Sequence, residues 1–284
     1  MTDPLDVGLL DAASGSAADI VGDEAYVAAM VDAERALLAA LALVGAAPAD
    51  AANALQSVPD AGALAAESRG GGNPVIPLIA ALRAGAPAEA RDAIHLGATS
   101  QDILDTAAML VASRVVAELG ALLPPVVQGL AALADEHRGT AVAGRTLGQQ
   151  AAPTTLGLRF AVLLDGVLRA WRRLESLPLP AQLGGSVGTL AVLVDVLGPE
   201  RAEQVRDAYA ANLGLGYRAV PWHVERAPIA ELGSALAILI GALGRIGLEV
   251  SQGTRAEIGE LDLAIAEGEG GSSAMPQKKN PVAA

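Results

Sequence analysis

Residues 99–123, TSQDILDTAAMLVASRVVAELGALL, form one continuous helical pattern. Alanine, leucine and valine dominate this stretch, and small or unbranched apolar side chains favour helices that pack closely together. We expect the helix to end at Pro124 and Pro125, which lack the N–H that a helix interior needs, and a new helix to begin there. The stretch therefore predicts a long helix at the centre of the fold.

Further long helical patterns lie on both sides of this stretch. We expect helices over 24–44, 153–177 and 228–266, the last being the longest of the chain, with shorter helices between them. Several long helices separated by short pieces are typical of a helical bundle. We therefore predict an all-α fold, with a small N-terminal helical domain over 1–98 and a central bundle of long helices over 99–284.

The composition limits the classes of function. Hydrophobic residues make up 52% of the 284 residues, which is enough for a sizeable core, whereas aromatic residues make up only 2%. The chain has no cysteine and only three, widely separated histidines, so a metal site would have to be built from carboxylates. A net charge of −13 without a lysine or arginine cluster argues against nucleic-acid binding.

Membrane insertion is not expected from the apolar runs. The longest, from Leu232 to Gly244, lies between Glu231 and Arg245 and is too short to cross a bilayer. The N-terminus, MTDPLDVGLL, lacks the basic region of a signal peptide. We therefore expect a cytoplasmic protein.

Polar, glycine-bearing segments at the edges of the long helices are candidate sites. The first is HLGATSQD, residues 95–102. Thr99 or Ser100 can cap the next helix, with Asp102 completing a capping box, but hydroxyls and free N–H groups at a helix N-terminus also form an anion site. Both interpretations can hold together.

The second segment is GRTLGQQ, residues 144–150. It is either an ordinary polar connection or a binding loop. In a binding loop, Thr146 and Gln149 would offer neutral hydrogen bonds to a carboxylate, while Arg145 could serve as a structural ion-pair partner.

The third segment is GGSSAMPQKKN, residues 270–280. Ordering so many glycines costs backbone entropy, so a plain surface turn rarely contains them. A mobile lid that closes over an anionic ligand would need such glycines. Closure of such a lid would bring Lys278 and Asn280 to the ligand and exclude water. The alternative is a flexible linker, for which Met275, Pro276 and two lysines are a poor composition.

The stretch GSSAMPQKKNP resembles the signature of the fumarase/aspartase superfamily, G-S-S-x-M-P-x-K-x-N, and the first two segments are similar to the other active-site segments of that family. The resemblance implies a helical homotetramer whose subunits share each active site, and a bond made or broken beta to a carboxylate of a small anionic polycarboxylate. It also implies that Ser272 is the catalytic residue, and that Thr99, Ser100, Thr146, Gln149, Lys278 and Asn280 bind substrate. We expect no cofactor and no metal.

Leu147 narrows the expected reaction. Relatives that eliminate amines carry a histidine at this position, because a nitrogen leaving group needs a proton, whereas a carboxylate can leave or attack as an anion. The leucine therefore suits lactone chemistry, and the chain resembles the superfamily's cycloisomerases of bacterial aromatic catabolism. Two alternatives stay open: another lyase of the superfamily, such as an adenylosuccinate lyase, and a non-catalytic helical assembly protein.

The sequence ends shortly after this signature, with only VAA following Pro281. Members of the superfamily continue into the rest of the bundle and a C-terminal domain, so we expect the C-terminal part of the fold to be missing. A lid anchored at one end pays more entropy to close, so we expect little or no turnover by the 284-residue chain alone.

Overall fold

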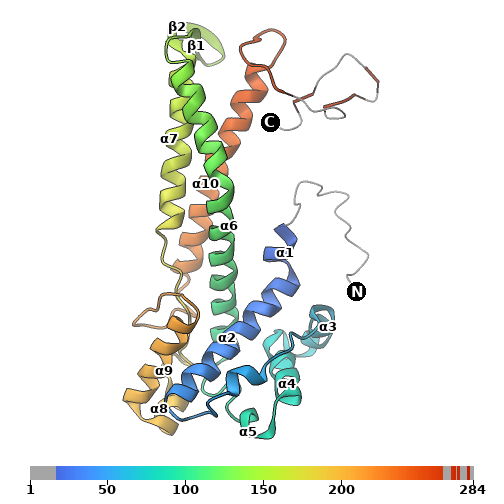
Figure 1. The fold of residues 1–284 in the computed structure, drawn as a ribbon, viewed down its shortest axis with the longest axis vertical. Coiled ribbons are helices and arrows are strands. Elements are labelled where there is room, and N and C mark those ends of the chain that lie inside the picture. The colour runs from blue at the N-terminus through green and yellow to red at the C-terminus, as the bar shows by residue number, and fades with distance from the viewer. Residues whose placement is uncertain (1–16, 265–269, 273, 276–279, 282–284) are drawn as a thin grey trace. The chain divides into compact units, whose positions relative to one another are not determined.

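The computed structural model describes residues 17–264, 270–272, 274–275 and 280–281 (Figure 1). It is mostly helical, which confirms the predicted fold class. The chain forms two compact units, one combining residues up to Glu118 with Pro178–Ile229 and the other combining Leu119–Leu177 with the residues from Ala230 onward. This division differs from the expected boundary at residue 98, because the first part of helix α6 (Ser100–Glu136), up to Glu118, and residues 178–229 pack with the N-terminal helices. The predicted domain boundary stays a prediction.

The first unit is built around helix α2, whose buried face includes Met30, Leu37 and Leu41. Helix α9 packs against α2 and adds Val205 and Tyr209 to the same core. The helices that belong wholly to this unit are α1 (Ala18–Val21), α2 (Asp23–Leu43), the short 3₁₀ helix η2 (Ala51–Ala54), α3 (Ala61–Gly71), α4 (Val75–Gly85), α5 (Ala88–Arg91), α8 (Ala191–Leu197) and α9 (Pro199–Asn212).

Helix α6 (Ser100–Glu136) is the longest helix that the structure describes and runs through both units. The expected break at Pro124 and Pro125 is wrong, because α6 continues through both prolines. Each proline removes one helical hydrogen bond, but two adjacent prolines can be accommodated in a long helix by a local bend. The expected pair of helices is therefore one.

The second unit contains a β-hairpin where an ordinary polar connection was one expectation. Strands β1 (Ala141–Thr146) and β2 (Gln149–Thr155) pair in antiparallel register, with Thr146 opposite Gln149. Pro153 lies in β2 and does not begin a helix as expected, because every strand of a two-stranded sheet is an edge strand and tolerates a missing donor. Helix α7 (Leu156–Glu175) begins three residues later, where the Thr155 hydroxyl accepts a hydrogen bond from the N–H of Leu158.

A glycine allows α6 and α7 to meet at the base of this hairpin. A Cβ atom on Gly157 would lie 2.5 Å from the carbonyl oxygen of Ala134 and 2.6 Å from the Cα atom of Arg138. The N–H of Gly157 donates to the carbonyl of His137, and that of Leu156 donates to the carbonyl of Thr140. The two helix ends are therefore held together by direct backbone contact (Figure 1).

Helix α10 (Ala227–Gly253) is shorter than the expected helix over 228–266. After Gly253 the chain turns back, and the N–H groups of Glu260 and Leu261 both donate to the Gly253 carbonyl. The Leu261 side chain occupies the space beside Gly253, where a Cβ atom would come within 2.6 Å of it. The missing side chain of Gly253 thus makes room for the turn that ends the helix.

Helices α6 and α10 are both long and apolar enough to cross a membrane by length and composition alone. The exclusion by length from the sequence does not hold, because each helix continues beyond the charged residues that interrupt its apolar runs. The long helices of a helical bundle satisfy the same two criteria. The finding therefore does not distinguish a membrane protein from a helical bundle.

Candidate active-site segments

The first segment is organised by a buried carboxylate. Asp102 is fully buried and accepts four hydrogen bonds, from the N–H of Thr99 at 3.0 Å, Nε2 of Gln182 at 2.9 Å, and the N–H groups of Gly184 and Gly185 at 3.0 and 2.9 Å. A capping box consists of two hydrogen bonds, and the bond from the Thr99 N–H to the Asp102 carboxylate is one of them. Burial raises the pKa of Asp102 above its ordinary value, although all four donors favour the charged form.

Thr99 and Ser100 lie at the start of α6 and are half-buried. They stand where the predicted anion site would need them, at the N-terminus of a long helix. Because Asp102 binds both the Thr99 backbone and the glycine-rich turn at 184–185, the position of this helix start is set by that turn. The structure therefore shows the capping role, and anion binding at this helix start stays a prediction.

A second carboxylate of the same helix holds an arginine that approaches from a distant segment. Asp105 accepts two hydrogen bonds from the guanidinium of Arg226, at 2.6 and 2.9 Å, and one from Nε2 of Gln101 at 2.9 Å. The side-chain oxygen Oε1 of Gln182 accepts a hydrogen bond from the backbone N–H of Trp222 at 2.7 Å. The first turns of α6 therefore bind the 182–185 and 222–226 segments through buried polar side chains.

The second segment forms the tip of the β-hairpin. Thr146 and Gln149 end β1 and begin β2, and both are exposed. Leu147 and Gly148 form the two-residue turn with positive φ angles of 51° and 77°, as a type I′ turn requires. The Leu147 side chain is fully exposed, so the residue at the position of the lyase histidine projects from the tip.

Below this tip, arginine and glutamate side chains form one connected network. Arg145 donates to both oxygens of Glu260, at 2.7 and 2.9 Å, and Arg159 donates to Glu260 at 2.5 Å and also pairs with Glu249. Glu249 is also 3.4 Å from a guanidinium nitrogen of Arg245. The two arginines, Arg145 first, hold the pKa of Glu260 at about 2. The expected ion-pair role of Arg145 is confirmed.

The third segment is described in part. The Ser272 hydroxyl oxygen accepts hydrogen bonds from the N–H of Met275 at 3.2 Å and the N–H of Ala274 at 3.4 Å. Asn280 donates through its own N–H to the carbonyl of Gly270 at 2.9 Å, and through Nδ2 to the carbonyls of Gly270 and Gly271 at 3.2 Å each. Asn280 therefore ties together the two ends of the segment. Lys278 lies outside the described residues.

Two cavities of ligand size lie near charged side chains, one in each unit. In the second unit, a cavity of about 470 Å³ is lined by Thr146 together with Arg145, Arg159, Arg245 and Glu249. Of the predicted substrate-binding residues that the structure describes, this cavity contains only Thr146. Within the described residues, no group of three or more histidine, aspartate or glutamate side chains could hold a metal ion.

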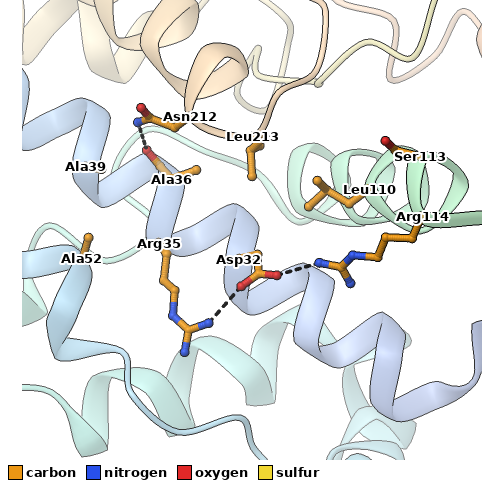
Figure 2. Close-up of a pocket in the computed structure, with 10 residues that line it drawn as sticks. All are labelled: Asp32, Arg35, Ala36, Ala39, Ala52, Leu110, Ser113, Arg114, Asn212 and Leu213. Atoms are coloured by element: carbon orange, nitrogen blue, oxygen red, sulfur yellow. Dashed lines mark hydrogen bonds and ion pairs between the residues drawn. The ribbon is translucent and has the colours of Figure 1, made fainter. Parts of the chain in front are cut away.

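The cavity of the first unit, of about 520 Å³, is lined by none of the predicted site residues whose positions are described (Figure 2). Asp32 pairs there with Arg35 at 2.9 Å and with Arg114 at 2.7 Å, so the carboxylate bridges α2 and α6. The Arg35 guanidinium also donates twice to the carbonyl of Leu55. The side chains that carry charge in this cavity are therefore engaged in holding the helices together.

The structure places the predicted residues in separate groups. Thr99 and Ser100 belong to the first unit, whereas Thr146, Gln149, Ser272 and Asn280 belong to the second. Sequence reasoning missed Glu260 and Glu249, although carboxylates next to long apolar helices are a usable signal, because a charge in such a place needs a partner.

Comparisons with known proteins extend the description. A model of the lyase family matches residues 17–284. The chain is 44% identical over 277 residues to a nitrosuccinate lyase of Streptomyces davaonensis, covering 93% of this chain and 58% of the relative. It is 40% identical over 292 residues to a 3-carboxy-cis,cis-muconate cycloisomerase of Bradyrhizobium diazoefficiens, covering 99% of this chain and 63% of the relative.

The solved structure of a 3-carboxy-cis,cis-muconate lactonizing enzyme from Pseudomonas putida superposes with a TM-score of 0.87 at 36% identity, over 97% of this chain and 63% of that one. The chain thus spans about three fifths of the length of these relatives. With the signature segment and a family match over nearly all its residues, the chain belongs to the lyase family of the fumarase/aspartase superfamily.

Proposed function

We propose that the protein is a 3-carboxy-cis,cis-muconate cycloisomerase. In this reaction one substrate carboxylate adds across a double bond to form the C–O bond of a lactone, 4-carboxymuconolactone, and a proton is placed on the neighbouring carbon. Four relatives with this name, at 37–40% identity, support the proposal, as does the solved structure from Pseudomonas putida.

The observation that carries the proposal is the environment of Ser272. A serine hydroxyl is a very weak acid, so it can move a proton only where nearby donors stabilise the alkoxide. Its oxygen already accepts two backbone N–H groups, from Ala274 and Met275. We assign Ser272 the proton that is delivered beside the new C–O bond. Thr99, Ser100, Thr146, Gln149, Lys278 and Asn280 are the proposed substrate-binding residues.

A second candidate is a nitrosuccinate lyase, which the relative of 44% identity favours. Nitrite, like a carboxylate, is stable as an anion and leaves without a general acid. The exposed Leu147 therefore suits this reaction as well as lactone formation. An adenylosuccinate lyase is less suited, because its nitrogen leaving group needs the proton donor that Leu147 does not supply.

The test compares two forms of the protein: residues 1–284, and the same residues extended with the C-terminal remainder of the Bradyrhizobium diazoefficiens relative. Each is incubated with 3-carboxy-cis,cis-muconate, nitrosuccinate and adenylosuccinate. Loss of the muconate absorbance alone, abolished by Ser272→Ala, is the expected result. Release of nitrite alone would replace the first proposal with the second.

Loss of adenylosuccinate alone would overturn the leaving-group argument. If the extended form consumes none of the three substrates, a non-catalytic assembly protein becomes the better account. We further propose a cytoplasmic homotetramer in the extended form, because the resemblance implies active sites shared among subunits. Light scattering after size-exclusion chromatography measures that assembly.

A further inference from the structure

The Glu260 carboxylate binds two elements of the second unit, at residues that precede it in the sequence by 115 and 101 positions. On one side, both of its oxygens accept hydrogen bonds from Arg145, the residue directly before Thr146 in strand β1. On the other side, it accepts a hydrogen bond from Arg159 in helix α7. In the sequence, Glu260 lies between the end of α10 at Gly253 and the signature segment that begins at Gly270.

The backbone of Glu260 is also held, by contacts with the end of α10. Its N–H donates to the carbonyl of Gly253 at 3.1 Å, and the neighbouring Leu261 packs into the space left by the missing Gly253 side chain. A rotation of the hairpin tip relative to α10 would therefore have to break the pair between Arg145 and Glu260.

The charged side chains of the network are largely shielded from solvent, so their ion pairs can contribute to holding the hairpin. The side chains of Arg145, Arg159 and Glu260 are 25%, 22% and 17% exposed, and Glu249 is 11% exposed. Partly buried pairs are screened less by salt than surface pairs, and bidentate arginine–carboxylate contacts fix orientation. Loss of Glu260 would leave two guanidinium groups without that partner beside the cavity that Thr146 lines.

We propose that Glu260 is a positioning residue for substrate carboxylates, an inference that rests on the proposed function. Both oxygens of Glu260 are already engaged by two arginines, and a carboxylate in direct contact with a polycarboxylate substrate would repel that substrate. Glu260 therefore acts through other residues. It holds Arg145 in a fixed position relative to the residues that follow α10. The neighbouring hairpin tip, which presents Thr146 and Gln149, is held with Arg145.

The test uses Glu260→Gln, which keeps the size of the side chain and removes its charge. The matched control is Glu225→Gln, which removes a carboxylate from an exposed pair with Arg218 at 3.7 Å. Hydrogen exchange of the amides in 141–155 is measured in the 1–284 chain. We expect Glu260→Gln to speed exchange in the hairpin by about tenfold or more, in line with the loss of a shielded ion pair, while exchange in α2 and in the control stays unchanged.

The kinetic arm uses the extended form. We expect Glu260→Gln to raise KM about tenfold with kcat changed much less, which is the signature of lost ground-state binding, and Glu260→Asp to restore part of the loss. An unchanged rate of hairpin exchange would overturn the inference, as would faster exchange with an unchanged KM. If the wild type consumes neither muconate nor nitrosuccinate, the proposed function fails, while hydrogen exchange still decides whether Glu260 holds the hairpin.

Discussion

Asp102 in the first unit and Glu260 in the second both organise a candidate active-site segment, but they do so by different means. Asp102 is fully buried and accepts hydrogen bonds from three backbone N–H groups and one side-chain amide, and no cation from the described part of the chain pairs with it. Glu260 is partly exposed and is held by two arginines. The first arrangement depends on burial and backbone geometry, and the second depends on charge. The two segments should therefore fail under different perturbations.

Removal of the buried carboxylate should have the largest effect. Asp102→Ala leaves three N–H groups and the Gln182 amide without their acceptor, so we expect the free energy of unfolding to fall by about 3–5 kcal/mol. Urea denaturation measures the loss. The control is Asp195→Ala, which removes an exposed carboxylate from α8 and should change stability by less than about 0.5 kcal/mol. A loss below about 1 kcal/mol in Asp102→Ala would mean that water readily replaces the carboxylate.

A smaller loss is expected where backbone contact, and not charge, holds the second unit. Gly157→Ala places a methyl group against the carbonyl of Ala134 and the backbone of Arg138, and should cost about 2–4 kcal/mol. Gly166→Ala is the matched control in the same helix, because nothing lies within 4 Å of its added Cβ atom. That variant should gain about 0.5–1 kcal/mol through helix propensity. Equal effects of the two changes would show that the helix ends are not in tight contact.

As the pH falls, the contributions of the two carboxylates to stability should change in opposite directions. The folded pKa of Glu260, about 2, lies below its ordinary value, so its contribution to stability is complete above that ordinary value and is lost as the pH falls toward about 2. The folded pKa of Asp102 is raised, so its contribution is greatest below the ordinary aspartate value and is lost as the pH rises through the folded pKa.

Chemical denaturation between about pH 6 and about pH 3 checks this difference. The stability gap between wild type and Glu260→Gln should shrink as the pH falls, and the gap between wild type and Asp102→Asn should grow. Parallel curves for the two variants would contradict the contrast between charge and burial.

The smallest effect concerns the hairpin turn. Leu147 holds a positive φ angle that costs a leucine about 1 kcal/mol and suits asparagine. We expect Leu147→Asn to raise the thermal midpoint slightly, with a gain of about 0.5–1 kcal/mol, and Leu147→Ala to leave it unchanged, since alanine keeps the same Cβ strain. A stability gain in the alanine variant would point to the exposed side chain instead of the backbone.

The helices were largely predictable, and their boundaries were not. The apolar spacing over 24–44 corresponds closely to α2, whereas Pro153 suggested a helix start and instead lies in a strand. A two-stranded hairpin gives few apolar positions to read, so its only local signal was Gly148 in the turn. Pro124 and Pro125 were interpreted as a stop because the sequence does not show how a long helix adjusts around them.

The candidate site was predictable where a motif names it and not where tertiary contacts build it. Ser272 and Asn280 follow from the signature, and their bonds to backbone groups came from the structure. The pairing of Arg145 with Glu260 joins residues far apart in the chain, and a single sequence carries no signal for such a partner. The capping pattern of Thr99 and Asp102 was local, and it was therefore visible in advance.

The contact between Gly157 and the end of α6 also makes the tip of the hairpin a replaceable module. The helices meet through backbone atoms of residues 134–138 and 157, so the distance that the hairpin must span is independent of its own sequence. Exposed connections on such a base tolerate exchange and insertion better than the elements they join. New tips could therefore be grafted onto this scaffold, with the chemistry at the tip changed while the helices beneath keep their packing.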